Sequence, residues 1–138
     1  MKALSAAVLL FLLSGPVYAG ERRPAPPQTI CPISGKQVDW STYVDVDGFR
    51  IFTLGPVEAD QVRKNPGQAF AAIAKNRQAA QPVVWKCPSM MRDVDPTYPY
   101  VQQGGKRIFY CCGPCQPRIK GNFNGAAAVM KRLAEQGG

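Results

Sequence analysis

The sequence predicts an α+β fold made of two small tandem repeats, and three observations lead to this prediction. Residues 43–52 align with residues 100–109, and six of the ten positions are identical. A Cys-Pro dipeptide precedes each aligned segment, beginning at Cys31 and at Cys87. Each segment has the pattern of a β-hairpin, and a helix-forming segment follows it. We therefore expect each repeat to consist of a cysteine knuckle, a β-hairpin and a C-terminal helix.

The first residues have the pattern of a secretory signal peptide. Lys2 supplies the charged start, residues 6–13 are apolar, and the small residue Ala19 precedes Gly20. We expect residues 1–19 to be cleaved off and the mature protein to be periplasmic or secreted. No later stretch approaches the ~20 apolar residues that a membrane-spanning helix needs. The sequence therefore predicts no integral membrane segment after signal cleavage.

The rest of the chain is expected to divide into a tether and the two repeats. Residues 20–30 are rich in proline, which favours an extended tether. The first repeat is predicted to cover residues 31–80 and the second residues 85–136. Gln81 and Pro82 lie between them and end the first repeat.

Each repeat contains two β-prone runs that flank a turn with glycine, Gly48 in the first repeat and Gly105 in the second. The predicted strands cover residues 43–46, 49–54, 98–102 and 106–111. A helix should follow each hairpin. In the first repeat Asn65 can cap a helix that begins at Pro66, and in the second the helix is predicted over residues 126–135.

The two repeats differ in their cysteines. The second repeat contains four, which are Cys87, Cys111, Cys112 and Cys115. The first repeat retains one cysteine, and other residues stand opposite the last three cysteines of the second repeat. These residues are Leu54, Gly55 and Glu58. We therefore interpret the first repeat as a degenerate scaffold and the second as the repeat that carries the functional site.

Both repeats resemble the YHS/TRASH group of small treble-clef-like modules, which is associated with heavy-metal sensing and trafficking. The resemblance covers nearly all of residues 31–136. It rests on the run that begins at Cys31-Pro32 and continues through residues 43–52, and on three cysteines that match the ligand positions of the family. These are Cys87, Cys111 and Cys115. The resemblance implies two tandem treble-clef-like copies, of which the second binds a heavy metal, and Cys112 is additional to the family pattern.

The chemistry of sulfur narrows the choice of metal. Thiolates select soft or borderline ions such as Cu(I) and Zn(II), and the chain contains no histidine, the commonest alternative ligand. Three thiolates, from Cys87, Cys111 and Cys115, suit trigonal Cu(I). A fourth thiolate, from Cys112 or Cys31, would give the tetrahedral geometry that is typical of zinc. We expect Cu(I) or Zn(II), with copper favoured.

Neighbouring residues bear on the reactivity of this site. The cysteines near Pro114 are expected close to a helix N-terminus and to three basic residues, which favours lowered pKa values and thiolates. The basic residues are Lys106, Arg107 and Arg118. Met90 and Met91 follow Cys87 and offer thioethers, although we expect these methionines to fill the core.

Two other functions compete with metal binding. Thiols of exported proteins usually pair, so Cys87 or Cys31 bonded to a C-terminal cysteine would give a disulfide-stapled interaction module. Cys112 and Cys115 also form the C-x-x-C pattern of thioredoxin-like thiol–disulfide oxidoreductases. Too few residues follow for the strands of that fold, and Pro117 should interrupt the helix start. We therefore expect a protein that is not an enzyme.

The charge of the chain indicates its partners. The net charge is +8, which in an exported protein favours solubility or attraction to an acidic partner or an anionic membrane surface. Motifs for nucleic-acid binding are absent from the sequence, and a catalytic triad is excluded because there is no histidine. The expected partners are the metal ion and a protein that donates or receives it, and we expect no binding to nucleic acid.

Overall fold

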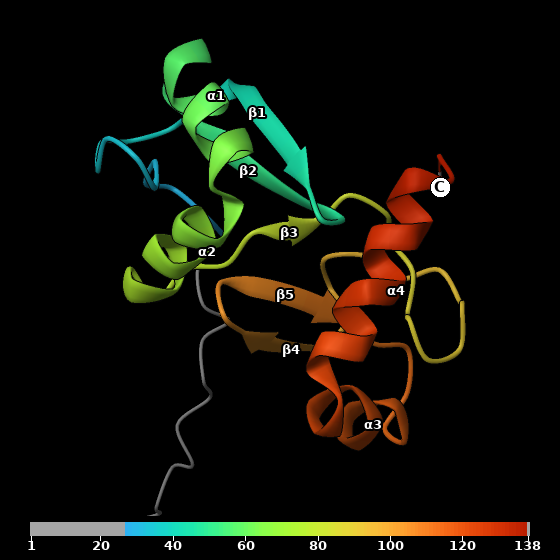
Figure 1. Ribbon diagram of the computed structural model, residues 1–138. Coiled ribbons are helices and arrows are strands. Elements are labelled where there is room, and N and C mark those ends of the chain that lie inside the picture. The colour runs from blue at the N-terminus through green and yellow to red at the C-terminus, as the bar shows by residue number, and fades with distance from the viewer. Residues whose placement is uncertain (1–26, 138) are drawn as a thin grey trace, which may run out of the picture.

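The computed structural model describes residues 27–137, which form a mixed α+β fold with two small antiparallel sheets and four helices (Figure 1). The elements in chain order are β1 (Asp39–Val46), β2 (Phe49–Thr53), α1 (Pro56–Lys64), α2 (Pro66–Lys75), β3 (Gln81–Pro82), β4 (Tyr100–Gln103), β5 (Lys106–Phe109), α3 (Cys115–Gly121) and α4 (Phe123–Glu135). The predicted α+β class is confirmed. The predicted signal peptide lies outside the described residues.

Both predicted hairpins are present. β1 pairs antiparallel with β2, and β4 pairs antiparallel with β5. The first turn has positive φ angles at Asp47 (52°) and Gly48 (85°), and the second at Gly104 (57°) and Gly105 (75°). Two successive positive φ angles are typical of a type I′ turn, whose twist matches that of the flanking strands. β3 pairs antiparallel with β2 and forms the third strand of the first sheet.

Two helices follow each hairpin, where the sequence predicted one. The additional helices are α1 and α3, and each has a proline near its start. Pro56 is the first residue of α1, and Pro117 is the third residue of α3. The N–H groups of the first turn have no partner within a helix, so proline is tolerated there. The expectation that Pro117 interrupts the helix start was wrong for this reason.

The longer helices, α2 and α4, have the same kind of N-terminal cap. The side-chain oxygen of Asn65 accepts a hydrogen bond from the N–H of Gln68 at 3.3 Å. The side-chain oxygen of Asn122 accepts one from the N–H of Gly125 at 3.1 Å. The cap predicted at Asn65 is thus present. The helix predicted to begin at residue 126 is α4, which begins three residues earlier, at Phe123, because Asn122 supplies its cap.

The first half (residues 31–80) and the second half (residues 85–136) share one hydrophobic core. Each hairpin turn lies against the last helix of the other half. A Cβ atom on Gly48 would lie 2.6 Å from the backbone nitrogen of Lys131 in α4, and one on Gly105 would lie 2.3 Å from the backbone oxygen of Phe70 in α2. Fully buried side chains of the core come from both halves, among them Phe49, Ile73, Ile108 and Met130.

Residues 27–30 differ from the extended tether that we expected over residues 20–30. The side chain of Gln28 is buried, donates a hydrogen bond to the carbonyl oxygen of Phe52 at 2.6 Å and accepts one from the Phe52 N–H at 2.9 Å. Buried backbone groups need hydrogen-bond partners. The side-chain amide of Gln28 supplies these partners to Phe52 of β2, as the backbone of a further strand would. The remainder of the expected tether lies outside the described residues.

None of the helices within residues 27–137 is both long enough and apolar enough to cross a lipid bilayer.

Candidate metal centre

Cys87 lies in a tight loop that fixes its position. Its N–H donates a hydrogen bond to the carbonyl oxygen of Arg92 at 2.8 Å, and its carbonyl oxygen accepts one from the N–H of Met91 at 2.8 Å. Met91 has a φ of 57°, a backbone conformation that is uncommon for a residue other than glycine. This knuckle holds Cys87 with no exposed surface.

Cys31 lies in a loop with the same hydrogen bonds. Its N–H donates to the carbonyl oxygen of Lys36 at 2.7 Å, and its carbonyl oxygen accepts from the N–H of Gly35 at 3.0 Å. Gly35 has a φ of 69°, so it takes the place that Met91 has in the second knuckle. The two Cys-Pro dipeptides therefore begin loops of the same local structure.

The other three cysteines of the second half lie where β5 is followed by α3. The N–H of Cys115 donates a hydrogen bond to the carbonyl oxygen of Cys112 at 3.1 Å, which closes a turn at the start of α3. This turn places the sulfurs of Cys111 and Cys115 4.0 Å apart. The sulfurs of Cys112 and Cys115 are closer, at 2.9 Å.

Three of the four predicted ligands come together. The sulfurs of Cys87, Cys111 and Cys115 lie within 4.8 Å of one another, and no other group of three or more potential ligands is found within residues 27–137. Three sulfurs at about 2.3 Å from a central ion would be about 4.0 Å apart in a trigonal arrangement. The group is therefore compact enough to close on one ion. Cys112 lies outside it.

The crowding of the thiols affects their ionisation. Burial, together with hydrogen bonding and charge repulsion from the neighbouring thiols, raises the pKa of Cys111 to about 12. A hydrogen bond from Cys115 lowers the pKa of Cys112. The expected lowering is therefore found at Cys112, whereas the expectation was wrong for Cys111. Neighbouring thiolates repel one another, so a cation bound between them would favour their ionised forms.

Two of the basic residues that were expected to lower these pKa values contact aromatic rings. The ammonium group of Lys106 lies 4.5 Å from the ring centre of Phe70. The guanidinium group of Arg107 lies 4.2 Å from the ring centre of Tyr100 and donates hydrogen bonds to the side chain of Gln102. β5 thus places the Lys106 side chain against the first half and the Arg107 side chain against β4, and proximity in sequence could not indicate these contacts.

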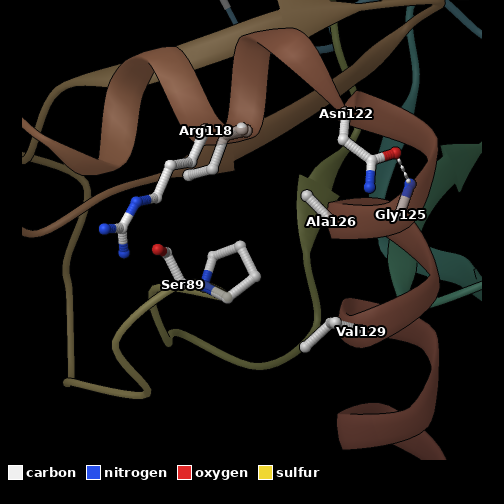
Figure 2. Close-up of a pocket in the computed structure, with 8 residues that line it drawn as sticks. Ser89, Arg118, Asn122, Gly125, Ala126 and Val129 are labelled. Atoms are coloured by element: carbon white, nitrogen blue, oxygen red, sulfur yellow. Dashed lines mark hydrogen bonds between the residues drawn. The ribbon is translucent and has the colours of Figure 1, made fainter.

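The surface beside the Cys87 knuckle carries features that the sequence did not predict. Met90 and Met91 are 47% and 49% exposed, so the expectation that they fill the core was wrong. A pocket of about 240 Å³ lies between the knuckle and helices α3 and α4. Figure 2 shows the side chains of Arg118 and Ser89 extending toward each other at one side of it, opposite Ala126 and Val129 of α4.

Cys31 lies apart from the group of three sulfurs. Burial raises the pKa of its thiol, but hydrogen bonds with the side chain and backbone of Ser34 outweigh burial and leave the pKa below its ordinary value. A hydrogen bond with the backbone of Leu54 acts in the same direction. Leu54 is the residue that aligns with Cys111, so the first half places an apolar side chain where the second half has a candidate ligand.

We predict that Cys31→Ser leaves metal binding intact. Because Cys31 is outside the group of three sulfurs, the variant should bind as many ions per chain as the wild type, with an affinity changed by less than about tenfold. Native mass spectrometry gives the stoichiometry, and competition with a chelator gives the affinity. Loss of the ion in this variant would mean that both halves supply ligands to one site.

All five cysteines are free thiols in the structure.

No protein-family model, no curated protein and no solved structure matches this chain. The similarity to the YHS/TRASH group therefore rests on the sequence motifs alone, and the functional argument rests on the geometry of the cysteines.

Proposed function

We propose that this protein binds one soft metal ion through the thiolates of Cys87, Cys111 and Cys115. The observation that carries the proposal is the proximity of three sulfurs, within 4.8 Å of one another, that come from two separate segments of the chain. Three sulfur ligands without histidine favour Cu(I) over Zn(II), which usually takes four ligands in a structural site.

The exposure of the ligands favours transfer of the ion over permanent storage. Cys87 and Cys115 are buried, whereas Cys111 is partly exposed. A thiolate of a partner protein can approach the ion from the side of Cys111 and exchange with it. We therefore propose a metal-trafficking protein that is not an enzyme, exported to the periplasm or secreted because of the signal-like pattern of residues 1–19.

We further propose that the two halves are copies of one treble-clef-like unit. Matching knuckles, type I′ turns and asparagine caps support this. The first copy would act as a scaffold. Leu54 and Gly55, which stand opposite two of the cysteines of the second copy, offer no metal ligand, and Glu58 is a hard oxygen donor that is poorly suited to Cu(I).

Metal titration of the full, reduced chain tests the proposed function. With Cu(I) supplied under anaerobic conditions, native mass spectrometry should detect one ion per chain, and Zn(II) should bind more weakly. The same spectra test the alternative of a disulfide-stapled interaction module, because each disulfide lowers the mass by about two hydrogens. Failure of the reduced chain to bind either ion stoichiometrically would overturn the proposal.

A further inference from the structure

Cys112 and Cys115 form a close pair, and only Cys115 of the two belongs to the candidate metal centre. Their sulfurs are 2.9 Å apart, closer than the 4.0 Å between Cys111 and Cys115. A disulfide bond is about 2.05 Å long, so these two sulfurs need to approach by less than about 1 Å to form one. Cys115 therefore belongs to two arrangements, the group of three sulfurs and this pair.

The two sulfurs of the pair differ in access to solvent. Cys112 is partly exposed, whereas Cys115 is 1% exposed. A disulfide compound in solution can reach Cys112, and Cys115 can react only with a sulfur already bound beside it. This division into an accessible and a buried thiol is what stepwise thiol–disulfide exchange needs.

We propose that Cys112 and Cys115 are a redox-active dithiol whose oxidation competes with metal binding for the sulfur of Cys115. The substrate class of the dithiol is a disulfide, either of low molecular weight or on a protein. The competition rests on the proposed metal-binding function, whereas formation of the Cys112–Cys115 disulfide does not.

The exchange proceeds in two steps. The Cys112 thiolate attacks one sulfur of the external disulfide, forms a mixed disulfide and releases the other sulfur as a thiolate. The Cys115 thiolate then attacks the sulfur of Cys112, forms the internal disulfide and releases the second thiolate. Two electrons pass from the dithiol to the external disulfide, and the two protons of the dithiol end on the two released thiols.

Oxidation and metal binding then exclude each other. Once Cys115 is bonded to Cys112, only Cys87 and Cys111 of the group of three sulfurs remain as ligands, and the ion should leave. Conversely, when Cys115 coordinates an ion, its sulfur is not free to attack the sulfur of Cys112 in the second step. The metal-loaded chain should therefore resist oxidation.

The test uses glutathione disulfide as the oxidant and the full chain in its reduced, metal-free form. Mass spectrometry should show the loss of about two hydrogens, and peptide mapping should place the disulfide between Cys112 and Cys115. After loading with Cu(I), the same treatment should form the disulfide at least about tenfold more slowly, and formation should be accompanied by metal release.

Two variants separate the parts of the proposal. Cys112→Ser should bind one ion like the wild type but release it at least about tenfold more slowly in glutathione disulfide. Cys111→Ser should lose stoichiometric metal binding and still form the Cys112–Cys115 disulfide. The wild-type mapping does not depend on how well either variant folds.

The outcomes distinguish the dithiol from the metal site. A disulfide that maps to Cys111 and Cys115, or oxidative metal release from Cys112→Ser at the wild-type rate, would overturn the inference while leaving the metal site in place. A chain that forms the Cys112–Cys115 disulfide and binds no metal would support the dithiol, overturn the proposed competition and refute the proposed metal-binding function.

Discussion

Replacement of Cys87 by serine is expected to abolish stoichiometric Cu(I) binding by the reduced protein. Cys87 is the one member of the group of three sulfurs that comes from the knuckle, so its loss leaves only the two sulfurs that follow β5. A serine hydroxyl is a hard, neutral donor that does not replace a thiolate for a soft ion. The affinity should fall by more than about 100-fold, measured by competition with a chromophoric Cu(I) chelator.

Cys31→Ser is the matched control for this substitution. Both side chains are fully buried, and both lie in knuckles with the same backbone hydrogen bonds. A general effect of serine in a buried knuckle would therefore appear in both variants. Normal metal binding by Cys87→Ser would contradict the proposed site. If the wild type also reduced insulin disulfides at thioredoxin-like rates, the function would be assigned to the C-x-x-C pair.

Replacement of Gly105 by alanine should cause the largest loss of stability among glycine substitutions in the second hairpin. Gly105 has a φ of 75°, and an added Cβ would lie 2.3 Å from the backbone oxygen of Phe70 and 3.3 Å from the backbone nitrogen of Ala74. Because backbone atoms of α2 cannot move aside as a side chain can, the two halves would have to separate locally. We expect a loss of roughly 2–4 kcal/mol in the free energy of unfolding, measured by urea denaturation.

Gly104→Ala controls for the backbone conformation alone. Gly104 has a φ of 57°, and nothing lies within 4 Å of the position of its Cβ. Its substitution should cost only about 1 kcal/mol, from the left-handed conformation. Equal losses in the two variants would show that a Cβ atom at position 105 meets no additional steric cost against α2.

Sequence reasoning worked where a structure depends on neighbouring residues. A type I′ turn is determined by two adjacent residues, so Gly48 and Gly105 were sufficient to indicate the hairpins. The cap at Asn65 involves a residue only three positions away. The helix α3 was missed although its signals are local, because Pro117 was interpreted as an interruption of the helix start. No helix was predicted at α1, which begins at Pro56.

The cysteine site was only partly predictable. The spacing of the cysteines indicated a sulfur site in the second half, but Cys87 is separated from Cys111 by a long segment that includes β4 and β5. Whether Cys112 belongs to the group depends on the turn at the start of α3, which places Cys112 close to Cys115 but outside the group of three sulfurs. Spacing alone could not show whether three or four sulfurs come together.

The sequence by itself thus determined the α+β class, the two hairpins, the cap of α2 and the set of four cysteines from which the candidate site is drawn. Only the tertiary structure decided which three sulfurs meet, that Cys112 pairs closely with Cys115, and that Gln28 belongs to the folded part of the chain. The physical reason is the range of the interactions. Turns and caps follow from the conformational preferences of a few adjacent residues, whereas contacts between distant segments depend on how the shared core packs.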